Sequence, residues 1–178
     1  MEKNTKWVID PTHSELLFKV KHLMITNVKG EFREFDGQII ANGEDFANAK
    51  VTATVNAGSV FTNNEDRDKH LKSEDFFDVT NHAKLTFEGS SFKHIKDDEY
   101  VLAGNLTIRG NTHPVELNVE FGGVAVDPWG NKKAGFSLSG KINRKNWGLN
   151  WNAALEAGGV LVSDEVKISA ELQFTVAE

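Results

Sequence analysis

One charged cluster, Arg67-Asp68-Lys69-His70, has residue types suited to anion binding or to acid–base chemistry. The guanidinium of Arg67 can pair with a phosphate or carboxylate, and His70 can add a hydrogen bond to the same group. Asp68 and His70 could instead act as an acid–base pair, although the sequence has no GxSxG elbow and no identifiable nucleophile. A solvated helix face with weak local ion pairs would have the same composition. The cluster therefore leaves three hypotheses: a polar ligand site, a catalytic pair and a plain surface.

The six histidines raise the question of a metal site. No HExxH motif or paired-histidine spacing occurs, and the absence of cysteine excludes thiolate ligands, disulfides and thiol nucleophiles. A zinc site would need His13, His22 and His70 from three distant segments, so we predict no metal, no cofactor and no catalytic residue. His22 falls on the apolar side of a predicted strand, where it is either a hydrogen-bonded core histidine or the polar end of a pocket. His13 is a further candidate for that polar end.

The balance of charges limits the expected partners. Lys plus Arg number 20 and Asp plus Glu number 26, which gives a formal charge of −6. This sign opposes nonspecific attraction to nucleic acid or to an anionic bilayer, so we expect no nucleic-acid partner.

The length of 178 residues predicts a single domain that spans residues 1–178. No segment approaches the ~18–20 consecutive apolar residues of a membrane-spanning helix, so we expect no transmembrane segment. Residues 1–7 lack the apolar run of ~7–15 residues found in a secretory signal, which predicts a cytoplasmic protein. A processed exported protein with a new initiator Met would look the same, and it would be periplasmic or secreted.

Eight segments alternate apolar and polar residues with a period of two, the pattern of a β-strand with one buried face. In the clearest of them, Val115, Leu117 and Val119 alternate with polar residues. Glycine and asparagine turn signals separate several of the segments. The pattern predicts an all-β fold in which antiparallel strands form a barrel or a strongly curled sheet. The eight segments are 16–22, 28–40, 51–57, 84–96, 100–108, 115–121, 136–142 and 166–176.

Two segments break this alternation and are the expected insertions between strands. In residues 62–77, Thr62 and Glu65 have the spacing of a capping box, which predicts a short helix with one apolar residue turned inward. Residues 144–159 are rich in glycine and end in Gly158-Gly159, which predicts a loop with no more than one helical turn.

The interior of an eight-stranded barrel is either filled by its own side chains or just wide enough for one small ligand. Ligand pockets are mainly apolar and aromatic, with a few polar groups at one end. The aromatic residues of this sequence fit both alternatives, a plain core and an elongated pocket. They are Phe18, Phe32, Phe76, Phe77, Phe87 and Phe136.

Seven motifs distributed along nearly the whole chain are specific in combination, although each alone would be weak. They are WVIDPTHS at 7–14, FKVKHL at 18–23, VKGEF at 28–32, NNEDRDKHL at 63–71, DFFDV at 75–79, GNLTIRG at 104–110 and INRKNWGL at 142–149. Through these motifs the chain resembles the YceI-like family, described as polyisoprenoid-binding or lipid-binding proteins of the lipocalin-like barrel type.

The resemblance implies an eight-stranded antiparallel lipocalin-like barrel with a short helical insertion, which encloses a long apolar channel. The ligand it implies is a polyisoprenoid, a fatty acid or a related long-chain amphiphile. Many relatives are exported to the periplasm and several look dimeric, which leaves a homodimer open for this chain.

Together, the residues and the resemblance predict non-catalytic binding, transport or storage of a long-chain amphiphile. Two alternatives are a lipid-processing enzyme that uses the same pocket and a stress-related structural barrel whose surface binds another protein. The predicted ligand contacts combine inward strand positions, the two insertions and the charged cluster. They are Phe18, Val20, His22, Phe32, Arg67, His70, Leu71, Phe76, Phe77, Phe87, Leu102, Leu106, Phe136 and Trp147.

Overall fold

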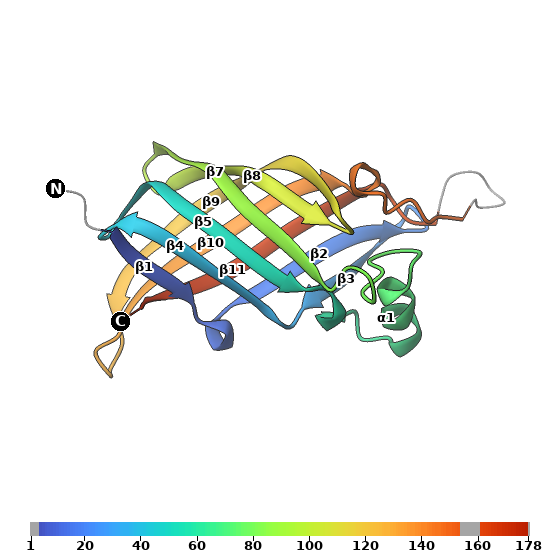
Figure 1. The fold of residues 1–178 in the computed structure, drawn as a ribbon, viewed down its shortest axis with the longest axis horizontal. Coiled ribbons are helices and arrows are strands. Elements are labelled where there is room, and N and C mark those ends of the chain that lie inside the picture. The colour runs from blue at the N-terminus through green and yellow to red at the C-terminus, as the bar shows by residue number, and fades with distance from the viewer. Residues whose placement is uncertain (1–3, 154–160, 178) are drawn as a thin grey trace.

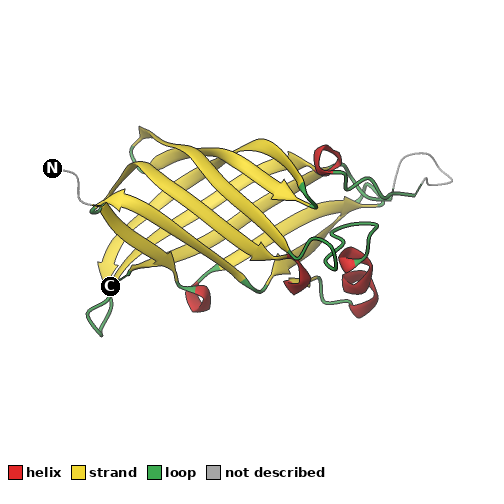
Figure 2. Cartoon of the chain, in the orientation of Figure 1, coloured by secondary structure: helices red, strands yellow, loops and turns green. Residues whose placement is uncertain are grey.

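The computed structural model describes residues 4–153 and 161–177, which fold into an antiparallel sheet rolled into a barrel (Figure 1). Figure 2 shows that the helical segments lie between strands and at the ends of the barrel. The helical elements are α1 (Glu65–Lys72) and the 3-10 turns η1 (Pro11–His13), η2 (Ala57–Ser59) and η3 (Arg144–Trp147). The strands are β1 (Asn4–Ile9), β2 (Glu15–His22), β3 (Thr26–Phe32), β4 (Phe35–Asn42), β5 (Asp45–Asn56), β6 (Val60–Phe61), β7 (Lys84–Lys96), β8 (Glu99–Ile108), β9 (Asn111–Val126), β10 (Lys132–Asn143) and β11 (Glu165–Val176).

The barrel closes with eight strands because three of its strands are interrupted. β1 and β2 pair one after the other along the same edge of β11, β1 with residues 174–176 and β2 with residues 167–171. In the same way, β4 pairs with β1 and β3 pairs with β2, so β4 and β3 lie one after the other along the next strand position of the barrel. β6 pairs with β3 and lies beyond the end of β5 in the same position. The ring β1-β4-β5-β7-β8-β9-β10-β11 closes through the pairing of β1 with β11. The predicted eight-stranded antiparallel barrel is confirmed.

Each of the eight predicted segments overlies a strand, with residues 28–40 divided between β3 and β4. The alternation pattern missed β1, because Trp7, Val8 and Ile9 form a continuous apolar run that hides the period of two. Trp7 is fully buried, and its Nε1 donates a hydrogen bond to the carbonyl oxygen of Gly43 at 3.1 Å.

The interruption between β1 and β2 is centred on Asp10 and Pro11. Pro11 has no N–H to donate to a ladder, and Asp10 caps η1. The Asp10 carboxylate accepts from the backbone N of Thr12 at 3.1 Å and from its Oγ1 at 2.7 Å. It also lies 2.9 Å from Nδ1 of His13 and 3.1 Å from Nζ of Lys133. The break in the strand is therefore tied to β10.

Aromatic side chains fill the end of the barrel where β1 begins and β11 ends (Figure 1). Phe46 is fully buried there, and its ring centroid lies 5.3 Å from that of Trp7, 5.2 Å from that of Phe121 and 5.1 Å from that of Phe136. The Phe174 ring packs on Phe136 at 5.9 Å. We call these five rings the aromatic plug, because they close one end of the barrel.

The helix α1 forms at the opposite end of the barrel and begins two residues later than the predicted capping box places it (Figure 1). Asn64 is the N-cap, and its side-chain oxygen accepts from the backbone N of Arg67 at 3.0 Å. Thr62 instead donates to the Asp68 carboxylate through its backbone N and its hydroxyl. Arg67 donates to the hydroxyl of Thr62 at 2.8 Å and to its carbonyl oxygen at 2.7 Å. The prediction of Thr62 as the cap was wrong, because side chains of the helix itself bind its hydroxyl.

In the described part of the second insertion, residues 144–153, one helical turn is present, the 3-10 turn η3. Gly148 ends this turn with φ of 81°, a left-handed conformation that favours glycine. The predicted stop at Gly158-Gly159 lies outside the described residues. None of the helices in the described part of the chain is both long and apolar enough to cross a membrane.

The Asp10 carboxylate gives a prediction on pH and stability. Hydrogen bonds from Thr12, His13 and Lys133 hold the pKa of Asp10 well below its ordinary value of 3.8. Because the folded pKa is lowered, Asp10 stabilises the fold above its unfolded pKa, and this contribution is lost as the pH falls from about 4 toward the folded pKa. Asp10→Asn should therefore lower the free energy of unfolding by roughly 1–2 kcal/mol at neutral pH, and by progressively less in acid, in urea titrations.

The matched control is Asp98→Asn, which makes the same change of charge at an exposed turn residue. Its stability should follow that of the parent protein at each pH. If the cost of Asp10→Asn were the same at neutral and acidic pH, the hydrogen bonds to Asp10 would not depend on its charge.

Candidate functional site

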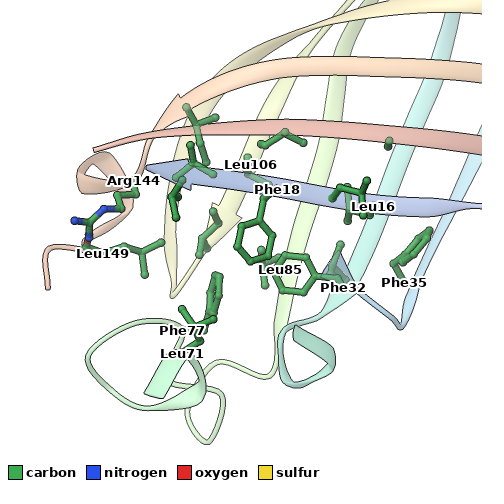
Figure 3. A pocket seen from close by; sticks show the side chains of 18 of the residues that line it. Leu16, Phe18, Phe32, Phe35, Leu71, Phe77, Leu85, Leu106, Arg144 and Leu149 are labelled. Carbon is green, nitrogen blue, oxygen red and sulfur yellow. The ribbon is translucent and has the colours of Figure 1, made fainter. Parts of the chain in front are cut away.

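The barrel encloses a cavity of about 640 Å³ between the aromatic plug and α1. Volumes of roughly 300–1,000 Å³ are typical of sites for organic ligands. Inward-facing side chains from nearly all barrel strands form the wall, and Figure 3 shows Phe18, Leu85 and Leu106 around the same open space. The alternative of a barrel interior filled by its own side chains does not fit this cavity.

Inward-facing glycines help to keep this part of the barrel hollow. A Cβ added at Gly104 would lie 2.5 Å from the ring of Phe87, and one at Gly30 would lie 2.2 Å from the ring of Phe18. Each ring therefore lies against the wall, over a position that has no side chain. Because the side chains of a strand alternate between its two faces, the pattern that makes the strands amphipathic also places these glycines inside.

The cavity is apolar near the aromatic plug and polar near α1. Leu102, Leu117 and Phe174 line the apolar part. A long amphiphile would match this distribution with its chain toward the plug and its head toward α1. The polar lining residues near α1 are Lys21, His22, Thr62, Asn64, Asp66, Arg67, His70 and Arg144, and Asp36, Thr52 and Thr86 line the wall formed by β4, β5 and β7.

All but two of the predicted ligand contacts line this cavity. Phe136 belongs to the aromatic plug and lies beyond the end of the cavity. Trp147 is buried behind the wall, where its Nε1 donates to the carbonyl oxygen of Leu106 at 2.8 Å and its ring contacts His113. The predicted contacts that do line the cavity are Phe18, Val20, His22, Phe32, Arg67, His70, Leu71, Phe76, Phe77, Phe87, Leu102 and Leu106.

Asp68 and His70 have different partners, which removes the basis for an acid–base pair between them. The Asp68 carboxylate accepts from Thr62, as described above. His70 Nε2 lies 2.9 Å from Oδ2 of Asp75, and its ring packs edge-on against Phe76 and Trp151 with centroids 5.0 and 4.6 Å apart. His70 is therefore part of an aromatic cluster at the polar end of the cavity.

Arg144 is a cavity residue that the sequence reasoning missed, although it lies inside the INRKNWGL motif. Its side chain is 3% exposed, and Figure 3 shows the guanidinium beside Leu149 at the edge of the cavity. It donates through Nε to Ser163 O at 2.9 Å, and through Nη1 to the carbonyl oxygens of Leu149 and Trp151. Burial lowers the pKa of Arg144 from its ordinary value, and the negative charge of Asp164 opposes this shift. A guanidinium remains protonated in proteins, so a buried cation borders the polar end of the cavity.

The hydrogen bonds of Arg144 also hold the wall of the cavity near α1. Its Nη2 donates to Val162 O at 3.4 Å, so the guanidinium connects residues 149–151 with residues 162–163. Leu149, Trp151 and Val162 all line the cavity. Arg144 is thus positioned to order three apolar wall residues as well as to supply a positive charge.

Comparisons with known proteins agree with this geometry. The model of the YceI-like domain matches residues 7–174. The chain belongs to the YceI-like family. Among curated relatives, a UPF0312 protein of Staphylococcus epidermidis is 44% identical over 173 residues, and the match covers 97% of this chain and 98% of that protein.

Solved structures show the same YceI-like barrel. The YCEI protein of Campylobacter jejuni is 30% identical, with a TM-score of 0.74 over 89% of this chain and 90% of that one. A polyisoprenoid binding domain from Saccharophagus degradans is 14% identical, with a TM-score of 0.67 over 96% of this chain and 98% of that one. At that identity the second likeness concerns the fold alone.

The three histidines considered as metal ligands in this YceI-like domain, His13, His22 and His70, have different surroundings. His22 and His70 line the cavity, whereas the exposed His13 pairs with Asp10 outside it. Within residues 4–153 and 161–177, no three His, Asp or Glu side chains are grouped as metal ligands.

The contacts of Arg144 predict that it is required for the stability of the YceI-like barrel near α1. Arg144→Met keeps a long side chain but leaves the carbonyl oxygens of Leu149, Trp151 and Ser163 without their donor, so we expect the free energy of unfolding to fall by about 3–5 kcal/mol. Chemical denaturation measures this loss. Arg144→Lys should recover part of it, because an ammonium group can donate to some of the same oxygens.

Arg33→Met is the matched control on the outer surface. Arg33 forms an exposed ion pair with Glu31 at 3.0 Å and stacks over the Phe61 ring. Loss of such contacts should cost no more than about 1 kcal/mol. Equal costs at Arg144 and Arg33 would contradict the role assigned to Arg144.

Proposed function

We propose that the protein binds one long-chain amphiphile in its barrel and carries or stores it without chemical change. The observation that carries this proposal is the apolar cavity of about 640 Å³ with positively charged residues at one end only. The separate partners of Asp68 and His70 favour binding over the enzymatic alternative.

Burial of the apolar chain would supply most of the affinity. Each buried methylene contributes about 0.8 kcal/mol, so a dozen contribute about 10 kcal/mol. A hydrogen bond to a charged head group contributes about 1.5–3 kcal/mol. Chain length and shape would therefore set the affinity, and the head-group contacts would set the orientation of the ligand.

The charges at the polar end favour a ligand with an anionic head. Arg67 and Arg144 line this end, and Asp66 is the acidic residue near them. Guanidinium groups bind carboxylates and phosphates well, because their donors match the spacing of two oxygens. A fatty acid or a phosphorylated isoprenoid has the required combination of chain and head.

The comparisons support an isoprenoid as one member of this ligand class. The Saccharophagus domain is named as polyisoprenoid binding, and it shares the barrel fold of this chain. The transfer of that ligand to this chain is our proposal. A homodimer and a cytoplasmic location stay predictions from the sequence.

Filling the cavity should abolish binding while the fold remains. Leu106 lines the cavity on β8, so Leu106→Trp should remove lipid that co-purifies with the parent protein at about one molecule per barrel. Native mass spectrometry of gently purified protein measures this occupancy. Overpacking is expected to cost about 1–3 kcal/mol of stability, which thermal melting will follow.

The matched control is Asn105→Trp, which adds the same ring at the exposed neighbouring position on β8. This variant should retain lipid. The proposal would be overturned if the parent protein were repeatedly ligand-free and failed to take up an added fluorescent fatty acid, or if Leu106→Trp bound it as the parent does.

Arg67 provides a separate test of the anionic head group. Arg67→Ala should weaken binding of an acidic lipid by about 1–3 kcal/mol, the scale of a charge-assisted hydrogen bond, and should affect a neutral lipid of equal chain length much less. Displacement of a fluorescent fatty acid measures both affinities. Thr62→Val removes the hydroxyl partner of Arg67 but keeps its charge, so it serves as the control for a merely structural effect. Equal losses for both lipids with a lowered melting temperature would assign Arg67 to the fold instead.

A further inference from the structure

The turn between β2 and β3 exposes three consecutive apolar side chains. Leu23 is 39% exposed, Met24 is 51% exposed and Ile25 is 78% exposed. Leu23 and Met24 also have φ of 56° and 64°, in the left-handed region that favours glycine and asparagine. A tight turn at this place does not need apolar residues, and the two left-handed residues strain its backbone. Apolar side chains kept exposed on a strained turn point to a contact outside the chain.

This apolar turn lies at the same end of the barrel as α1 and the polar end of the cavity (Figure 1). His22, the residue before Leu23, lines the cavity. The backbone N of Leu23 donates to Leu161 O at 2.9 Å, and Leu161 lines the cavity as well. Whatever the turn touches is therefore close to the end of the cavity where a ligand head would lie.

A row of lysines crosses the outer face of the strands next to this turn. Lys29, Lys19, Lys167 and Lys141 are paired in register across β3, β2, β11 and β10, and all four are exposed. Like charges placed opposite each other destabilise a sheet. Within the described residues, Lys141 has an ion pair with Glu165 at 3.7 Å, and the other three have none within 4.0 Å. The fold alone does not explain this lysine row.

The lysine row makes this one face of the barrel basic, although the chain as a whole carries a charge of −6. Lys21 adds a further exposed positive charge between the lysine row and the turn. The segment 62–78 around α1 is net acidic, because Glu65, Asp66, Asp68, Glu74, Asp75 and Asp78 outnumber Arg67, Lys69 and Lys72. Since exposed charges are screened beyond about 8 Å at physiological salt, a surface that approaches β2 and β3 experiences the local lysines more than the net charge.

We propose that the apolar turn 23–25 and the lysine row form a docking surface for an anionic lipid bilayer. The three apolar side chains enter the interface between head groups and acyl chains, and the lysines lie against the negatively charged head groups. Long lysine side chains can keep their charged ends at this level while their stems lie along the apolar surface. The acidic insertion is repelled, which selects the side of the barrel that faces the bilayer. In this orientation the polar end of the cavity lies next to the membrane.

Binding to vesicles of known composition tests this surface without any cargo. The full chain should sediment with phosphatidylcholine vesicles that contain phosphatidylglycerol, should bind pure phosphatidylcholine vesicles much less, and should release when salt is raised. The apolar variant M24N/I25N and the charge variant K19S/K29S/K167S should each weaken binding by at least ~10-fold. Asparagine accepts the left-handed conformation at position 24, so the first variant should melt no lower than the parent protein.

Matched variants at the opposite end of the barrel control for exposed apolar residues and for charge in general. K50S/K93S/K96S removes three exposed lysines from β5 and β7. Trp129→Ser removes a tryptophan that is 83% exposed in the turn between β9 and β10. Both variants should bind vesicles within about two-fold of the parent protein.

Several outcomes would overturn the docking surface. These are no binding of the parent protein to anionic vesicles, equal binding to neutral and anionic vesicles, unchanged binding of M24N/I25N, or a larger loss in Trp129→Ser than in M24N/I25N. Displacement of a fluorescent fatty acid by the same variants reports separately on the cavity. Failure of docking and failure of the proposed ligand binding would therefore be distinguished.

Discussion

The distribution of side-chain volume along the inside of one closed sheet determines the rest of this structure. An eight-stranded barrel has just enough room for its own inward-facing side chains, so a small change in their size decides between a core and a cavity. At one end, Trp7, Phe46 and Phe136 pack ring against ring and fill the space. Toward the other end, Gly30 and Gly104 let neighbouring rings lie against the wall. The same strands therefore form a packed core at one end of the barrel and a cavity toward the other end.

The open end of the barrel depends on polar contacts more than on packing. Arg144 connects residues 149–151 with residues 162–163 through carbonyl oxygens and holds apolar wall residues in place. Thr62 is held in the same way by Arg67 and Asp68 of α1. Hydrogen bonds are directional, so they can position short irregular segments that bury too little apolar area to order themselves. Two guanidinium groups thereby both stabilise this end and supply its positive charge.

Because the cavity has an apolar wall and a charged end, different parts of it determine the affinity and the orientation of a ligand. The apolar wall between plug and α1 can bind many chains of suitable length, because dispersion and the hydrophobic effect have little directionality. The charged residues act only where the chain ends, and they distinguish one end of a ligand from the other. Outside the barrel, the uneven placement of lysine and acidic residues gives the molecule a basic side despite its negative net charge.

Alternation in the sequence is enough to predict which side of the eight predicted segments faces inward, because it depends only on the pleat of the backbone. Phe18, Val20 and Leu106 were identified in this way, and all three line the cavity. Alternation indicates whether a side chain points into the barrel, but not how far along the barrel axis that side chain lies. Phe136 and Leu138 face the same side of β10, yet Phe136 lies in the plug and Leu138 lines the cavity.

The depth of a residue along the barrel axis depends on the folded structure, because it follows from the register between strands that are far apart in the sequence. The folded structure also decided the place of Arg144, whose partners are carbonyl oxygens 5 to 19 residues away in irregular segments. Every residue carries a carbonyl group, so no pattern of side chains in the sequence could reveal these contacts.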